Sequence, residues 1–485
     1  MNQASELPVR STKSGRAPLP PGPSGNLILG VMPEFSRDTL GFIERARSYG
    51  DVVRMRFLYL TAYFLYNPDD IEYVVATNAK NFIKSRTLRS PFFQRLVGNG
   101  LLTSEHDEWK RQRRLAQPAF HRQRINSYGE VMVDYTQRMI SAWNHGEERD
   151  VHRDMMRLTL EIVVKTLFNA DVSADADKVG RVLAQIVKPF AAQATLKWIM
   201  DNRLPTAAHR RFNQDANEID AIVYRIIAER RGSDRDQGDL LSMLLQAHDE
   251  DGTQMSDKQL RDEVMTLFLA GHETTALTLS WAWYLLALNP ETETKFHQEL
   301  EEVLGGNLPT VADLPRLKYC EMIAKESMRL YPPAFGLGRE SLEECEVGGF
   351  RMPAKTQVFM FQWVTQRDPR YFDRPAEFHP ERWTEEFSNS LPKYAYFPFG
   401  GGPRFCIGNS FAMMEIILVL ATIGQRYRLS LAPNQTVTVM PAMSLRPRDG
   451  IRMRINRLLS APSAATPRVL ESRRDAADRS QPGKE

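Results

Sequence analysis

The chain has 485 residues, of which 42% are hydrophobic and 25% are charged, and its formal net charge is +3. This balance excludes a strongly basic nucleic-acid-binding protein and is ordinary for a globular chain. The three cysteines are too few for a disulfide framework or for the four ligands of an all-cysteine iron–sulfur cluster. We therefore expect a reducing compartment, the cytoplasm.

The N-terminal part predicts a flexible lead followed by a β-hairpin. Residues 1–24 are polar and proline-rich, without an apolar stretch as long as a signal peptide or a membrane anchor, so we expect no membrane span. From Asp51 to Tyr66, β-branched and aromatic residues dominate, which predicts a two-stranded hairpin. Most of residues 69–330 shows the periodicity of helices.

A basic helical stretch follows the hairpin. Trp109 and Arg113 are four residues apart and therefore share one helix face. The basic residues beside them, Lys110, Arg111 and Arg114, are most simply a solvated face. The alternative interpretation is a docking surface for an acidic protein partner.

The longest predicted helix begins at a capping box formed by Ser256 and Gln259 and ends before Pro290. At about thirty residues it is long enough to cross a whole domain. Its middle contains the small residues Ala270 and Gly271, although glycine costs about 1 kcal/mol relative to alanine inside a helix. These small residues indicate space for a flat or diatomic group.

Two polar residues, Glu273 and Thr274, follow in the same helix. The simplest interpretation is a buried polar patch whose groups bond to their neighbours. The alternative is an acid–alcohol pair that moves protons into a buried site. The Thr274 hydroxyl can also bond back to a carbonyl of the preceding turn and bend the helix.

The segment that follows mixes a helix with short strands. Glu326 and Arg329 lie three residues apart on one helix face, which is weak evidence by itself. Strand patterns return over residues 339–364, where Arg339 is the first basic residue after a Pro-Pro turn.

The sequence FGGGPRFCIG, from Phe399 to Gly408, surrounds Cys406. Its glycines let the backbone approach other atoms closely and adopt positive φ, so that backbone N–H groups can point at the sulfur. Arg404 supplies a cation two residues before it. Because an apolar run of helix length follows, the thiolate would lie near a helix N-terminus, where the dipole lowers a cysteine pKa. Such a thiolate can be an axial ligand to iron.

The end of the chain predicts one more strand and a tail. Residues 451–455 alternate between apolar and basic side chains, whereas residues 458–485 are polar and charged and predict disorder. We therefore expect one domain over residues 25–457.

At the cysteine loop the chain resembles the cytochrome P450 family of haem-thiolate monooxygenases, whose loop reads Phe-x-x-Gly-x-Arg-x-Cys-x-Gly. This pattern is matched by Phe399, Gly402, Arg404, Cys406 and Gly408. Other family motifs are matched at residues 109–113 (Trp-x-x-x-Arg), 270–275 (Ala/Gly-Gly-x-Asp/Glu-Thr-Thr), 326–329 (Glu-x-x-Arg) and 380–383 (Pro-Glu-Arg-Phe/Trp). The resemblance covers about residues 18–457.

The resemblance implies a mainly α fold with a smaller β region, as a single domain with a long central helix over haem b. It makes Cys406 the axial ligand of the haem iron. The residues that it implies for binding the cofactor are Trp109, Arg113, Ala270, Arg339, Phe399, Arg404, Cys406 and Gly408. Among them, the tryptophan and the three arginines would hold the haem propionates.

The resemblance also assigns roles to the remaining motifs. Thr274 would hydrogen-bond the iron-bound oxygen, and Glu273 would relay protons from solvent. Glu326, Arg329 and Arg382 would form a buried ionic triad that supports the haem loop.

The implied activity is insertion of one atom of O₂ into a C–H or C=C bond of an apolar small molecule by a monomeric enzyme. Only 79 residues follow Cys406, so we expect electrons from a separate ferredoxin or flavodoxin whose reductase uses NAD(P)H. Two alternatives remain. The first is a peroxide-dependent hydroxylase or a haem-thiolate isomerase, although family members of these types commonly lack an acid–alcohol pair such as Glu273 and Thr274. The second is a non-enzymatic haem sensor.

Candidates for the substrate pocket follow from position alone, and each is as compatible with plain core. They are Phe92, Phe93, Leu96, Leu101, Leu102, Ala334, Phe335, Leu337, Ala442, Met443 and Leu445.

Overall fold

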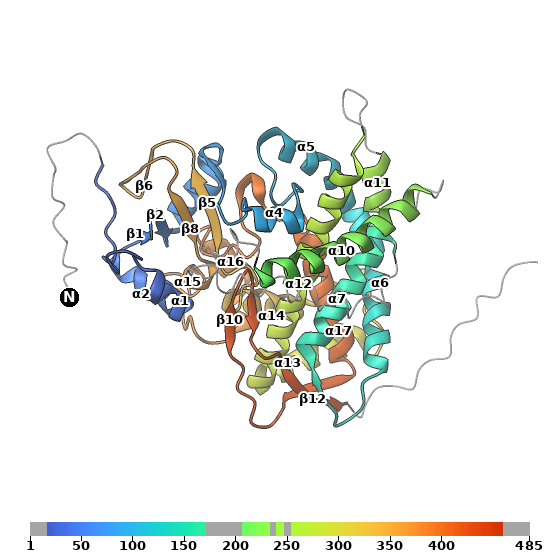
Figure 1. Cartoon of the computed structure of the whole chain (residues 1–485). Helices are drawn as coiled ribbons and strands as arrows, with labels where there is room; N and C mark the ends of the chain where they lie inside the picture. Colours follow the sequence, from blue (N-terminus) through green and yellow to red (C-terminus); the bar gives the residue numbers. More distant parts are fainter. Residues whose placement is uncertain (1–16, 171–205, 233–238, 247–253, 459–485) are drawn as a thin grey trace, which may run out of the picture.

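The computed structural model of the chain describes residues 17–170, 206–232, 239–246 and 254–458. Most of the predicted lead and nearly all of the predicted tail lie outside the described residues, so the domain limits 25–457 remain a prediction. Figure 1 shows a large helical part beside a smaller part that contains strands and the first two helices. The predicted mainly α fold with a smaller β region is confirmed.

The described residues form α-helices of 4 to 32 residues. They are α1 (Met32–Arg37), α2 (Thr39–Ala46), α3 (Pro68–Glu72), α4 (Pro91–Val97), α5 (His106–Ala116), α6 (Arg122–Ser141), α7 (Val151–Phe168), α10 (Ala207–Arg231), α11 (Leu240–Gln246), α12 (Asp257–Leu288), α13 (Pro290–Leu304), α14 (Lys318–Leu330), α15 (Gln362–Thr365), α16 (Glu385–Ser390) and α17 (Asn409–Gly424).

Helix α12 is the predicted long helix, and its start is set by the predicted capping box. The Ser256 hydroxyl accepts a hydrogen bond from the Gln259 N–H, and the Gln259 side chain accepts one from the Ser256 N–H, 2.9 Å away. With 32 residues, α12 is about 48 Å long. It packs against α7, α10, α14 and α17, so most of its length is buried on all sides.

In the described residues, the strands form one five-stranded sheet, one three-stranded sheet and two two-stranded sheets. They are β1 (Val52–Phe57), β2 (Leu60–Leu65), β3 (Phe82–Lys84), β4 (Glu148–Asp150), β5 (Leu337–Ser341), β6 (Cys345–Val347), β7 (Phe350–Met352), β8 (Gln357–Met360), β9 (Tyr427–Leu431), β10 (Val439–Pro441), β11 (Leu445–Pro447) and β12 (Arg452–Arg457). The large sheet has the order β1-β2-β8-β5-β3, in which only the β2–β8 pair is parallel.

The predicted hairpin is β1–β2, with Val52 opposite Leu65, and the predicted short strands are β5 to β8. The register at the sheet edge has a consequence for the site, because Lys84 of β3 pairs directly with Arg339 of β5. Residues directly opposite one another in neighbouring strands carry their side chains on the same face. The fold thus places two cations side by side.

Candidate active site

The cysteine loop is a tight turn that glycine makes possible. Cys406 lies between a short 3₁₀-helix, Gly402–Arg404, and the start of α17, and its N–H donates to the Phe399 carbonyl over 3.0 Å. Gly402 has a φ of +62°, and a Cβ atom there would lie 1.8 Å from the Val75 carbonyl oxygen. The predicted close approach of backbone therefore occurs at this glycine.

The electrostatics of the Cys406 thiol combine opposing effects. Cys406 is exposed, but the protein atoms around it still desolvate the thiol and raise its pKa, while a hydrogen bond from the Gly408 N–H and the positive charge of Arg113 act in the opposite direction. The net pKa is above the ordinary value, so the predicted lowering near a helix N-terminus does not prevail in the protein alone. The predicted N–H group aimed at the sulfur is present.

Two buried cations lie side by side at the edge of the large sheet. Lys84 and Arg339 are each only 7% exposed. Desolvation is the largest influence on both, and it lowers the pKa of each. Among the described residues, the Lys84 ammonium has no hydrogen-bond or ion-pair partner, and the Arg339 guanidinium bonds only the Gly338 carbonyl, at 2.9 Å.

A third cation, Arg404, completes this cluster. It donates to the Ser104 carbonyl at 2.8 Å and forms an ion pair with Glu105, and its guanidinium lies 4.0 Å above the Trp109 ring. The other influences on Lys84 are repulsion from Arg339 and Arg404 and attraction to Glu105. One carboxylate cannot neutralise three largely buried cations, and unpaired buried charges are costly. The cluster therefore fits an anionic group with more than one negative charge.

Arg113 lies on the cysteine side of the site. Its guanidinium donates to the Phe405 carbonyl at 2.7 Å and to the Gln117 side chain at 3.2 Å. The structure thus places Arg113 beside the thiol, whereas Arg404 lies over Trp109. No sequence motif singles out Lys84, because only the register between β3 and β5 brings that lysine opposite Arg339.

The middle of α12 is the accessible part of an otherwise buried helix. Ala270 is exposed and Thr274 is half-buried, although both lie among buried neighbours. The Thr274 hydroxyl donates to the Ala270 carbonyl at 2.8 Å, which is the predicted bond back to the preceding turn. A Cβ atom on Gly271 would lie 2.6 Å from a methyl group of Val163 in α7, so glycine also permits close packing there.

Glu273 has different hydrogen-bond partners from those of Thr274, the next residue in the chain. It is 2% exposed, and its Oε1 accepts from the Arg446 Nε at 2.7 Å and from the Ser444 hydroxyl. Desolvation raises its pKa, but Arg446, the Ser444 hydrogen bond and His272 outweigh that effect, and the net pKa is lowered. Arg446 belongs to β11, and no motif in the sequence singles it out.

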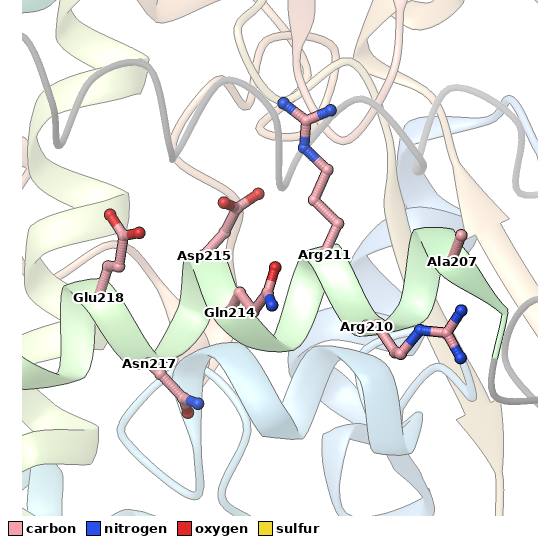
Figure 2. Close-up of a pocket in the computed structure, with 7 residues that line it drawn as sticks. All are labelled: Ala207, Arg210, Arg211, Gln214, Asp215, Asn217 and Glu218. Atoms are coloured by element: carbon pink, nitrogen blue, oxygen red, sulfur yellow. The ribbon is translucent and has the colours of Figure 1, made fainter.

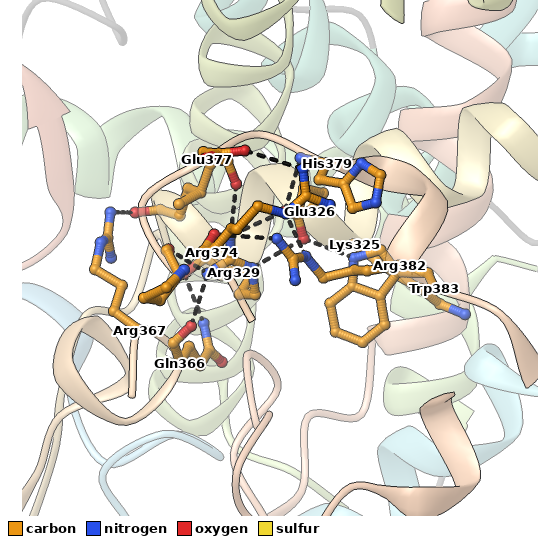
Figure 3. Close-up of polar contacts among 12 residues, drawn as sticks. Lys325, Glu326, Arg329, Gln366, Arg367, Arg374, Glu377, His379, Arg382 and Trp383 are labelled. Carbon is orange, nitrogen blue, oxygen red and sulfur yellow. Dashed lines mark hydrogen bonds and ion pairs between the residues drawn. The ribbon is translucent and has the colours of Figure 1, made fainter. Parts of the chain in front are cut away.

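The predicted ionic triad is present and supports the segment before the cysteine loop (Figure 3). The Glu326 carboxylate accepts from Arg329 at 2.8 and 2.9 Å, from the Arg382 Nε at 2.9 Å and from the Trp383 indole at 2.9 Å. It also accepts from the backbone N–H of His379 at 3.0 Å. Every lone pair of this fully buried carboxylate therefore has a donor in reach, and Arg329 donates further to three backbone carbonyls.

The candidate residues for the substrate pocket differ in how deeply they are buried. Phe93, Leu96 and Leu445 are fully buried, which agrees with plain core. Phe92 is partly buried and stacks on Phe212 of α10, with ring centroids 3.8 Å apart. A separate polar pocket of about 670 Å³ lies along the first turns of α10 and contains none of the predicted site residues (Figure 2).

Within the described ranges, no three His, Cys, Asp or Glu side chains gather into a metal site. No helix of the described part is both long enough and apolar enough to cross a bilayer. The candidate site combines a single cysteine in a backbone turn, a buried cation cluster and an accessible helix middle. These features fit the protein part of a haem-thiolate site.

Comparison with known proteins agrees with this class. The family model described as Cytochrome P450 matches residues 20–454. The chain is 38% identical to "Cyclooctatin synthase" of Streptomyces melanosporofaciens, over 87% of this chain and 92% of that protein. It is 31% identical to "Pentalenene oxygenase" of Streptomyces avermitilis, over 84% of this chain and 91% of that protein.

A solved structure, "Crystal structure of cytochrome P450DA heme domain", matches with a TM-score of 0.81 and 28% identity. The match covers 91% of this chain and 98% of that one. The chain belongs to the cytochrome P450 family. It is a haem-thiolate monooxygenase, with a haem cofactor, an apolar substrate and a redox partner that supplies electrons.

Proposed function

We propose that the protein oxidises a terpenoid, at a C–H or C=C bond. The observation that carries this proposal is the agreement among the Streptomyces relatives, which include "Cyclooctatin synthase", "Cyclooctat-9-en-7-ol 5-monooxygenase" and "Pentalenene oxygenase". The second of these is 34% identical over 89% of this chain. An apolar substrate also suits the partly buried aromatic residues, such as Phe92, that pack between α4 and α10.

The cofactor would be held at its two ends by different parts of this site. Cys406 would hold the haem iron through its sulfur, in a loop shaped by Phe399 and Gly408. The buried cations Lys84, Arg339 and Arg404 are suited to the two carboxylates of haem b, because these would neutralise charges that Glu105 alone cannot. Haem, when bound, supplies the iron at which dioxygen is activated.

The remaining cofactor contacts are assigned to the helix side and to α5. Trp109 supports the Arg404 guanidinium from below, and Arg113 contributes positive charge beside the cysteine. Ala270 lies at the accessible middle of α12 and leaves room there because its side chain is a single methyl group. These residues position the cofactor and tune the electrostatics of its site.

Thr274 and Glu273 are the proposed catalytic pair. The Thr274 hydroxyl is the polar group at the accessible middle of the helix, where it can hold or pass a proton. Glu273 is the adjacent acid, and it is shielded from solvent. An acid that is buried next to an accessible hydroxyl can deliver protons without opening the site to bulk water.

We further propose that the electron donor is a ferredoxin or flavodoxin with an NAD(P)H-dependent reductase, in the cytoplasm, and that the enzyme is a monomer. The basic residues of α5 offer a surface for an acidic donor. Arg113, in the same helix, reaches the backbone beside Cys406.

The substrate proposal is tested by titrating the purified ferric protein with cyclic terpene hydrocarbons and alcohols. An apolar substrate that binds beside the haem would change the absorption spectrum of the ferric protein. We expect terpenoids to give this change at lower concentrations than fatty acids of equal carbon number. Fatty acids that bind more tightly than every terpenoid tested would overturn the substrate class and leave the enzyme class intact.

A further inference from the structure

The ion pair between Glu273 and Arg446 connects the proposed catalytic acid to a residue that has no role in the proposed function so far. The two side chains come from elements far apart in sequence, α12 and β11, and both are buried. Arg446 reaches Glu273 Oε1 with its Nε at 2.7 Å and its Nη2 at 2.6 Å. The Ser444 hydroxyl donates to the same oxygen. Two hydrogen-bond donors, the Arg446 Nε and the Ser444 hydroxyl, thus converge on one carboxylate oxygen, and the Arg446 Nη2 lies within ion-pair distance of it.

The direction of this contact sets Glu273 apart from Thr274. Successive residues of a helix are about 100° apart around its axis, so the two neighbours face different surroundings. Thr274 lies at the accessible middle of α12, and Glu273 is turned into the protein, toward β11. A proton donor held in this way must exchange its proton while paired or leave Arg446 during the reaction.

The other groups that face this pair are two histidines. His272 adjoins Glu273 on α12, is fully buried, and bonds the Phe268 carbonyl through Nδ1 at 2.6 Å. His152, in the first turn of α7, has its pKa lowered to about 4 by desolvation and by Arg446, against the attraction of Glu273. Desolvation also lowers the pKa of His272. Both histidines are therefore neutral near pH 7, and Arg446 is the cation that balances Glu273.

We infer that Arg446 is a positioning residue for proton delivery, which together with Ser444 holds Glu273 as an ionised carboxylate between turnovers. The inference rests on the proposed role of Glu273. For each proton delivered, the carboxylate would take one proton from the solvent side and release one proton toward Thr274, so that Glu273 returns to its ionised state. The ion pair makes Glu273 a stronger acid than an unpaired buried carboxyl would be, which favours rapid release.

The test compares Arg446→Met, which removes the charge and keeps the length of the side chain, with Arg446→Lys, which keeps the charge. The Arg230→Met variant is the control for the loss of stability that follows when any buried ion pair is removed. Arg230 and Asp239 form such a pair away from the site, at 2.5 Å. A double variant, Arg446→Met with Glu273→Gln, reports effects that act through Glu273 alone.

The first readout needs no turnover. Infrared spectra in H₂O and D₂O count protonated carboxyl groups in the folded protein. Wild-type protein should already show buried neutral carboxyls, since burial raises the pKa of Glu263 to about 8 and that of Glu415 well above its usual value. At pH 7 we expect Arg446→Met to add the band of one further carboxyl, which the double variant lacks. Arg446→Lys should not add it, and a band that Arg230→Met adds, from its buried partner Asp239, would persist when Glu273→Gln is introduced as well.

The second readout is the ratio of product formed to dioxygen consumed in the haem-loaded enzyme. A more weakly acidic Glu273 donates more slowly, so this ratio should fall by roughly tenfold in Arg446→Met and recover in part in Arg446→Lys. The inference is overturned if Arg446→Met loses stability, as Arg230→Met does, without a carboxyl band that Glu273→Gln removes and without a changed ratio. Failure of the monooxygenase assignment would appear differently, as absence of product from the wild-type enzyme.

Discussion

At the scale of single residues, the candidate site contains buried charges that are balanced to different degrees. Lys84 and Arg339 are adjacent like charges, and Glu273 is an anion paired to Arg446 inside the protein. Like charges placed directly opposite in a sheet destabilise it, and burial increases that cost. The cation cluster is therefore expected to make the haem-free protein less stable and to favour the loaded one.

The Lys84→Met substitution tests this expectation. Removing an unpaired buried ammonium should raise the unfolding temperature of the haem-free protein at pH 7. The desolvation that lowers the Lys84 pKa destabilises the folded state, and a methionine side chain does not have this unfavourable free energy. The same substitution should accelerate haem transfer to an acceptor protein. The exposed Lys80→Met is the control for both measurements. If haem transfer is as slow in Lys84→Met as in wild type, Lys84 does not contact a propionate.

Glu263 predicts a specific pH dependence of stability. It is 1% exposed, and burial raises its pKa to about 8, with Leu101 N–H as a donor at 3.1 Å. Because the folded pKa lies above the unfolded value near 4.5, stability is lost as pH rises from about 4.5 to about 8. Glu263→Gln keeps an acceptor for Leu101 and abolishes this loss.

Chemical unfolding between pH 5 and pH 9 measures the effect. We expect Glu263→Gln to be more stable than wild type at pH 9, on the order of a few kcal/mol, with a smaller difference at pH 5. The exposed Glu301→Gln, in α13, serves as control. Parallel pH profiles for Glu263→Gln and wild type would contradict the raised pKa.

At the scale of elements, the cysteine loop is held by backbone geometry more than by side chains. Gly402 has positive φ and lies against the Val75 carbonyl, so a side chain there would strain the turn and displace the segment after α3. Gly349, in the turn between β6 and β7, has a similar φ of +77°, but a Cβ atom added there would meet no other atom within 4 Å. A substitution at either glycine would strain the backbone, but only a substitution at Gly402 would also create a steric clash.

Alanine substitutions at these two positions give a matched comparison. Gly349→Ala should cost about 1 kcal/mol through φ alone. Gly402→Ala should cost several times as much and should also loosen haem binding, because the loop carries Cys406. Urea unfolding and the haem content of the purified variants measure both effects. Equal costs would show that the close approach to Val75 is relieved without consequence.

At the scale of the whole molecule, local signals in the sequence predict local structure well. The capping box at Ser256 starts α12, the hairpin over residues 52–65 forms, and Thr274 bonds back to the preceding turn. The triad around Glu326 follows from the family resemblance. Each of these depends on residues near in sequence or on a recognised motif.

The contacts that the sequence does not predict join distant segments. Arg446 lies 173 residues after Glu273, and Lys84 meets Arg339 only through the register of β3 against β5. No spacing rule connects such positions, because a strand register is decided by the packing of the whole sheet. For the same reason, the net pKa of Cys406 cannot be derived from its place before a helix, since desolvation depends on the complete fold.

The central claim is that Cys406 ligates haem iron as a thiolate, and the absorption spectrum of the dithionite-reduced protein under carbon monoxide tests it most directly. We expect a strongly red-shifted Soret band in wild type, its retention in Cys345→Ser and its loss in Cys406→Ser. Cys320 is fully buried in α14, outside the cysteine loop. A band typical of histidine or thiol ligation in wild type, or a red-shifted band that persists in Cys406→Ser, would contradict the account.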